Sequence, residues 1–77
     1  MSKEQYDKIV NNAKQTLDIN ILDKISEFNY KDVDGYYVIQ VYVKETIKAK
    51  EMGTILTNLE DYAKECGSNI LVDFLRG

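Results

Sequence analysis

Hydrophobic residues near the start of the chain recur every three to four positions, which is the spacing of one helical face. They are Tyr6, Ile9, Val10, Ala13 and Leu17, and mostly charged or amide side chains separate them. Ser2 and Gln5 have the spacing at which a serine hydroxyl and a glutamine amide cap a helix start reciprocally. The pattern predicts an amphipathic helix over about residues 3–17.

The segment that follows fits two structures. Ile21, Leu22, Ile25 and Phe28 continue a helical stripe, whereas Ser26, Phe28 and Tyr30 alternate with polar residues as in a strand. Residues 31–35 are expected to form a turn, because Asp34-Gly35 before an apolar run is a strong hairpin signal. The hairpin favours an extended segment from about Ile25 to Tyr30, but the choice for residues 18–30 stays open.

The clearest strand covers residues 36–44, which are rich in β-branched and aromatic side chains. Successive side chains of a strand point to opposite faces. One face here is wholly apolar, with Tyr37, Ile39, Val41 and Val43. The other, which we call the mixed face, carries Tyr36, Val38, Gln40, Tyr42 and Lys44.

A second helix is predicted between this strand and Gly67, a residue suited to the left-handed position after a helix. Its start is open because Thr46 or Thr54 could cap it and Gly53 weakens its first part. Its apolar positions are Ile55, Leu56, Leu59, Tyr62, Ala63 and Cys66. A last strand over residues 69–76 would place Ile70, Val72 and Phe74 on one face and Leu71, Asp73 and Leu75 on the other.

These elements predict an α+β fold of order α-β-β-α-β, in a single small domain covering residues 1–77. The sheet would have three strands, with an antiparallel hairpin and a last strand reached through a helix that permits a parallel crossover. The helices would pack mainly on one face.

Few residue types suited to catalysis occur. The sequence has no histidine, and its four glycines form no phosphate-binding loop. Aligning Gly35 with the glycine of a calcium-binding loop leaves Tyr30 and Val41 at the two anchoring carboxylate positions. Cys66 lies on the apolar stripe of its helix and is expected to be buried and unreactive. We therefore expect a protein that is not an enzyme and has no catalytic residues, no cofactor and no metal.

Charge and cysteine content narrow the partners and the compartment. The formal net charge is −3, with thirteen acidic and ten basic residues and no polybasic stripe. We therefore do not expect nucleic acid to be the main ligand. One cysteine cannot form an internal disulfide, and no apolar stretch is long enough to span a membrane. These features indicate a cytoplasmic protein.

The mixed face is the candidate binding site. One alternative is that the first helix or residues 18–28 cover the mixed face, so that both faces of the sheet are buried. We expect instead an apolar, aromatic patch left for a protein partner or a second copy, because small chains often gain stability by association. A homodimer is predicted. The candidate partner-binding residues are Tyr36, Val38, Gln40, Tyr42, Leu71, Asp73 and Leu75.

Residues 59–75 form a tyrosine-bearing helix, a Cys66-Gly67 pair and a hydrophobic strand. This segment resembles the end of barstar-type ribonuclease inhibitors, over less than a quarter of the chain and without a diagnostic motif, so no residue roles are carried over. The resemblance implies an inhibitor or immunity factor, and our main hypothesis is a non-enzymatic protein-binding module of that type. The alternative is a regulator associated with nucleic acid through Lys44, Lys48 and Lys50.

Overall fold

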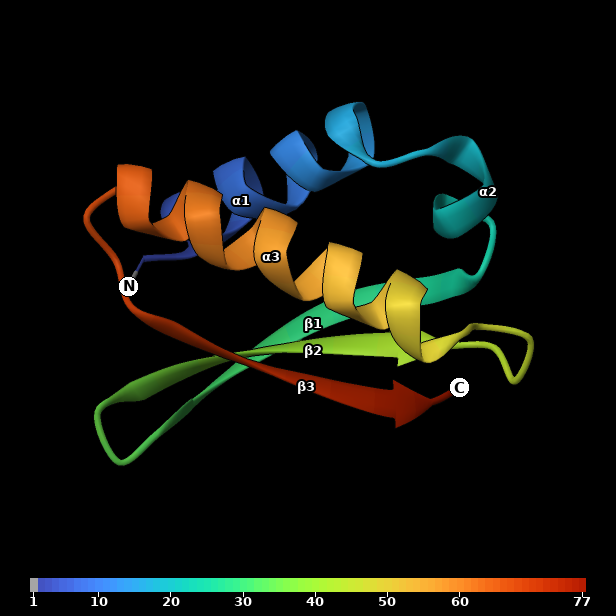
Figure 1. Cartoon of the computed structure of the whole chain (residues 1–77). Coiled ribbons are helices and arrows are strands. Elements are labelled where there is room, and N and C mark those ends of the chain that lie inside the picture. The colour runs from blue at the N-terminus through green and yellow to red at the C-terminus, as the bar shows by residue number, and fades with distance from the viewer. Residues whose placement is uncertain (1) are drawn as a thin grey trace.

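The computed structural model describes residues 2–77 and has the predicted α-β-β-α-β order, with one short additional helix (Figure 1). The elements are α1 (Lys3–Thr16), α2 (Ile19–Leu22), β1 (Ile25–Val33), β2 (Tyr36–Val43), α3 (Ala49–Glu65) and β3 (Ile70–Arg76). The three strands form one mixed sheet in the order β1-β2-β3. The predicted fold class is therefore confirmed.

Helix α1 begins with the reciprocal cap that the sequence predicts. The Gln5 N–H donates to Ser2 Oγ over 3.2 Å, and the Ser2 N–H donates to Gln5 Oε1, also over 3.2 Å. These bonds satisfy two of the donors that a helix start leaves unpaired. The apolar stripe of α1 faces the core, where Ile9 and Ala13 are fully buried.

The ambiguous segment contains both structures. Asp18 caps the short helix α2, since its Oδ1 accepts the Asn20 N–H at 2.7 Å, and β1 starts at Ile25. The pairing of β1 with β2 shifts between Ile25 and Glu27, as in a β-bulge. Ile25 and Phe28 consequently both pair with buried residues of β2 although they are three positions apart. The bulge explains why this strand start has a helix-like spacing.

The β1–β2 hairpin closes through a two-residue loop. Asp34 and Gly35 have φ of 49° and 82°, and the flanking residues Val33 and Tyr36 pair directly. Positive φ at both loop positions is what the favoured tight hairpin turn requires. The hairpin prediction is confirmed, but the expected turn over residues 31–35 was too long, because β1 continues to Val33.

Helix α3 provides the crossover from β2 to the parallel strand β3. It starts at Ala49 rather than at a threonine cap, so the expectation of Thr46 or Thr54 was wrong. The Glu51 carboxylate instead accepts the Lys48 N–H at 2.9 Å, which satisfies one donor of the first turn. The helix ends at Glu65, and Gly67 takes the predicted left-handed position after it, with φ of 76° and the Ser68 N–H donating to the Ala63 carbonyl over 2.8 Å.

The molecule has two layers (Figure 1). Helices α1 and α3 lie on the same side of the sheet and bury its apolar face; the fully buried large side chains are Ile9, Ile39, Ile55, Leu59 and Val41. No helix in the described part of the chain covers the other side of the sheet, which is the mixed face. The alternative of a sheet with both faces covered by its own helices is therefore excluded for residues 2–77.

Candidate interaction face

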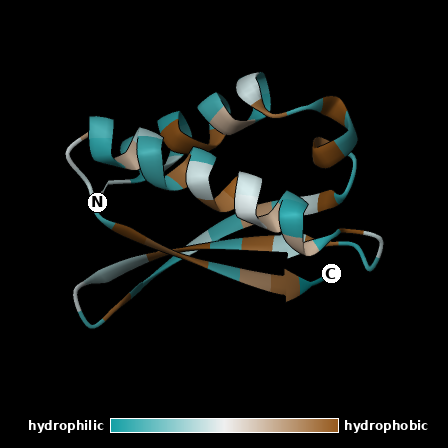
Figure 2. Cartoon of the chain, in the orientation of Figure 1, coloured by the Kyte–Doolittle hydropathy of each residue, from teal (hydrophilic) through white to brown (hydrophobic). Residues whose placement is uncertain are grey.

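The strand register places all seven candidate residues on one side of the sheet. Leu71, Asp73 and Leu75 of β3 lie beside Val38, Gln40 and Tyr42 of β2, and Tyr36 shares their face by alternation. In Figure 2 both contributing strands alternate between hydrophobic and hydrophilic colours along their length. That these residues share an uncovered face is a structural fact, whereas their binding of a partner stays a prediction.

Exposure differs strongly within the mixed face. The side chains of Tyr36 and Leu71 are 62% and 52% exposed, whereas Val38 between them is only 8% exposed. Val38 forms the floor of a shallow hollow of about 500 Å³. Tyr36 and Leu71 also line this hollow.

Strand β1 contributes residues that the sequence analysis missed. Lys31 lies beside Val38, and Val33, which is 40% exposed, lies beside Tyr36; both line the same hollow. They were missed because they were assigned to the turn. The available signal was the Asp34-Gly35 pair, because a two-residue hairpin loop there makes Val33 the last residue of the strand and places Lys31 on the same face as Val33.

The opposite end of the mixed face is more closed. Tyr42 and Leu75 are half-buried. A Cβ atom added to Gly77 would lie 2.9 Å from Tyr42 Cβ and 3.0 Å from its ring carbon Cδ1, so Gly77 permits a close approach to this ring. The apolar surface available to a partner is thus concentrated at the Tyr36 end.

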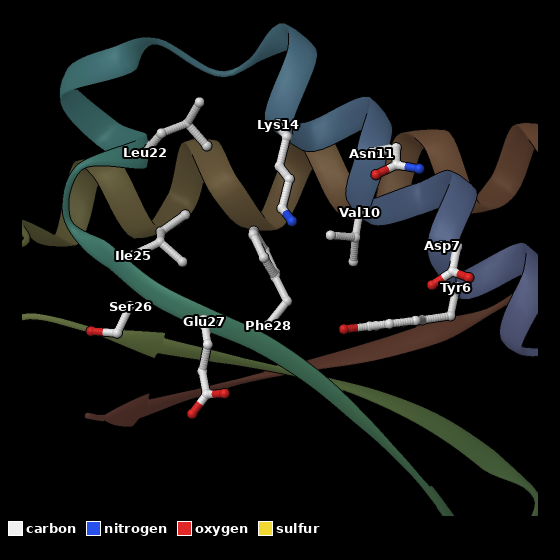
Figure 3. Close-up of a pocket in the computed structure, with 10 residues that line it drawn as sticks. All are labelled: Tyr6, Asp7, Val10, Asn11, Lys14, Leu22, Ile25, Ser26, Glu27 and Phe28. Carbon is white, nitrogen blue, oxygen red and sulfur yellow. The ribbon is translucent and has the colours of Figure 1, made fainter.

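A second concave region lies between α1 and β1 (Figure 3). It has a volume of about 480 Å³; Val10 and Phe28 point into it, and Lys14 reaches over it from α1. At its other end burial, followed by the nearby Asp7 carboxylate, raises the pKa of Tyr6 to about 12. A phenol with such a pKa is neutral near pH 7 and is a poor general base.

Tyr6 belongs to an aromatic cluster under the helices. Its ring centroid is 4.4 Å from that of Tyr30, which in turn stacks on Tyr37 at 5.3 Å. Burial also raises the pKa of Tyr37. The cluster joins α1, β1 and β2, so its clearest role is packing. Sequence periodicity assigned Tyr6 and Tyr37 to core faces but gave no sign that Tyr30 lies between them.

The three lysines of the alternative hypothesis are exposed around the connection from β2 to α3. Two carboxylates lie close to these lysines in the sequence: Glu45 follows Lys44, and Glu51 lies in the first turn of α3. Glu51 binds the Lys48 N–H and also Lys24, whose Nζ lies 2.8 Å from Glu51 Oε1. The region is therefore a mixed-charge surface rather than a continuous basic patch.

Two further expectations concern chemistry. Cys66 is half-buried and lies just after Glu65, the last residue of α3, so the prediction that it is buried was wrong. That its thiol is unreactive stays a prediction. Within residues 2–77, no cluster of three or more histidine, cysteine, aspartate or glutamate side chains is arranged to hold a metal ion. Over the same range, no helix is both long and apolar enough to cross a membrane.

Comparison of the chain with protein-family models, with curated proteins and with solved structures gives no match. The resemblance of residues 59–75 to barstar-type inhibitors gains no support from these comparisons.

Proposed function

We propose that this chain is a non-enzymatic protein-binding module that inhibits or modulates a protein partner through the mixed face. One observation carries the proposal: no helix among residues 2–77 lies over this side of the sheet, and its most exposed residues include Tyr36 and Leu71. Exposed apolar surface of this kind on a small protein often marks a contact with another protein. Tyrosine is also a frequent energetic centre of such contacts.

The residue types present support binding rather than catalysis. The sequence lacks histidine, and the buried tyrosines have raised pKa values that keep them neutral. A cytoplasmic location is part of the proposal, because a single cysteine suits a reducing compartment.

The test is an affinity capture from the source cell with three immobilised chains: wild type, Leu71→Ser and Ile19→Ser. Ile19 is the matched control, since it is an apolar side chain 67% exposed on α2, away from the mixed face. A genuine partner is retained by wild type and by Ile19→Ser and is lost from Leu71→Ser. That partner is then purified, and calorimetry measures its affinity while an activity assay records inhibition or modulation.

Two results contradict the proposal. In the first, every captured protein is retained equally by Leu71→Ser, which means that the mixed face is not used. In the second, the chain co-purifies with nucleic acid that is released steeply with salt and is lost when Lys44, Lys48 and Lys50 are changed to glutamine. The second result would establish the regulator associated with nucleic acid.

A further inference from the structure

The mixed face contains a row of polar side chains that constrains what can cover it. Asn29 of β1, Gln40 of β2 and Asp73 of β3 lie side by side across all three strands. An apolar surface pressed against this row would leave an amide or a carboxylate without hydrogen-bond partners, which is costly. A stable cover must therefore present matching donors and acceptors at the same positions.

We propose that a second copy of this chain covers the mixed face, packed face to face about a twofold axis parallel to β2. This inference rests on the proposed use of the mixed face in protein binding. Rotation about such an axis places each row of residues across the sheet opposite the same row of the second copy, and it places β1 of one copy opposite β3 of the other. Asn29 then lies opposite Asp73 of the second copy, and Gln40 lies opposite Gln40 of the second copy. An amide can donate to a carboxylate, and two amides can each donate and accept, so the polar row satisfies itself.

The charges at the two edges favour the same arrangement. Lys31 on β1 and Asp73 on β3 are both exposed, and neither belongs to an ion pair within the described residues. The axis parallel to β2 brings Lys31 to the β3 edge of the second copy, one row from its Asp73. An axis across the strands and through the polar row would place β3 over β3 and set the two Asp73 carboxylates against each other, although it would also bring Lys31 close to Glu27 of the second copy. The opposed Asp73 carboxylates therefore favour the axis parallel to β2.

The area of the face sets the expected strength. Three strands spaced about 4.8 Å apart, each about eight residues long at about 3.3 Å per residue, give a footprint of roughly 14 by 26 Å. Two such footprints together cover roughly 730 Å², below the roughly 1,200 Å² at which interfaces of standard size begin. We therefore expect a dimer with a dissociation constant in the micromolar range, sensitive to single charge changes.

The experiment is analytical ultracentrifugation of the full chain up to roughly 100 µM, well above the expected constant. Wild type should sediment as twice the 8.9 kDa chain mass. Lys31→Glu and Asp73→Lys should each raise the dissociation constant at least about tenfold, because each symmetric dimer contains the altered pair twice. An equimolar mixture of the two variants should recover the dimer, since one chain then presents two carboxylates and the other two amines. Lys8→Glu on the outer side of α1 is the control and should leave the constant unchanged.

Three outcomes overturn the inference. Wild type that remains a monomer at the highest concentration excludes a second copy, while a captured partner that depends on Leu71 would still support the proposed function. A dimer that neither reversal weakens has its interface elsewhere. If both reversals weaken the dimer but the mixture does not restore it, Lys31 and Asp73 are not paired across the interface, and the assigned axis is wrong. Circular dichroism of each variant establishes that the loss is not unfolding.

Discussion

Tyr36 and Tyr37 are neighbours in β2 and have opposite environments. Tyr37 points under the helices, stacks on Tyr30 and is 5% exposed, whereas Tyr36 points to the mixed face and is 62% exposed. The same contrast extends along β2. Its residues on the helix side are all apolar or aromatic, whereas those on the mixed face include the polar Gln40. The central strand thus packs into the core with one face and leaves the other face without a helix over it among the described residues.

Val38 and Val41 refine this comparison, since both are buried but for different reasons. Val41 is fully buried beneath the helices. Val38 is only 8% exposed, with Lys31 and Leu71 beside it on the neighbouring strands, although none of the helices in the described part of the chain lies above it. Burial alone therefore does not distinguish a core from the floor of a binding surface, and the cover above the residue must also be known.

The largest expected effect is a difference in stability between substitutions at two adjacent residues of β2, Val41 and Tyr42, which lie on opposite faces. Val41→Ala removes fully buried methyl groups and leaves a cavity, so we expect it to lower the free energy of unfolding by about 2 kcal/mol. Tyr42→Ala removes a half-buried ring from the mixed face and should lower stability less while weakening association more. Denaturant titration and an association assay on the same variants measure both quantities. If Tyr42→Ala is as destabilising as Val41→Ala and leaves association intact, the mixed face is a second core.

A smaller effect on stability is expected at the exposed wall of the hollow. Leu71 is 52% exposed, so Leu71→Ser should change the free energy of unfolding by no more than about 0.5 kcal/mol. Ile70→Ser, at the buried neighbouring position, is the matched comparison and should cost several times as much. Urea titration of both variants measures the difference. Equal losses would show that the two faces of β3 are packed alike.

Alkaline pH should act on the helix side of the molecule. The pKa of Tyr6 is about 12 in the folded chain and 10.0 in its ordinary state, so folding favours the neutral phenol. This contribution is complete below pH 10 and is lost as the pH rises through 12. Tyr6→Phe cannot ionise there, and we expect its stability to fall less than that of wild type over this interval. Urea titrations at several pH values test this, and identical pH profiles would contradict it.

The smallest effect is expected in acid. The hydrogen bond from Lys24, followed by that from the Lys48 N–H, lowers the pKa of Glu51 below its ordinary value of 4.5. Its contribution is therefore present above pH 4.5 and is lost as the pH falls through the lower value of the folded chain. Glu51→Gln should show a weaker acid dependence of stability than wild type, and Lys24→Met should change the dependence in the same direction. Thermal unfolding followed between pH values on either side of 4.5 measures this; an unchanged acid profile in Glu51→Gln would contradict it.

The parts of the fold that sequence predicted are those with a local physical cause. The cap between Ser2 and Gln5 involves residues three positions apart, and the Asp34-Gly35 loop requires only its own two residues. The start of α3 was not predictable in this way. Its cap depends on a backbone N–H at Lys48, a position whose lysine side chain has no acceptor and therefore no capping signature.

The residues of the mixed face were also predicted only in part, since those of β2 and β3 were identified and those of β1 were missed. Alternation alone identified the residues of β2 and β3, because each strand is rich in β-branched or aromatic side chains. The contribution of Lys31 and Val33 depended on where the turn begins, and the bulge near Ser26 disturbed the alternation of β1. Whether a second molecule covers the mixed face depends on contacts between chains, which alternation within one chain does not describe.

The two connections within the sheet also differ in the time they require to form. The hairpin between β1 and β2 closes over Asp34 and Gly35, whereas the pairing of β2 with β3 must wait until the whole of α3 has brought the chain back. Short loops close within microseconds, and contacts between distant residues slow the approach to the native state. We infer that the hairpin with its bulge is already paired in the transition state for folding and that β3 joins afterwards. Substitutions in β3 should then accelerate unfolding while leaving the refolding rate nearly unchanged, which stopped-flow kinetics of Val72→Ala would reveal; a refolding rate that falls in proportion to stability would place β3 in the nucleus.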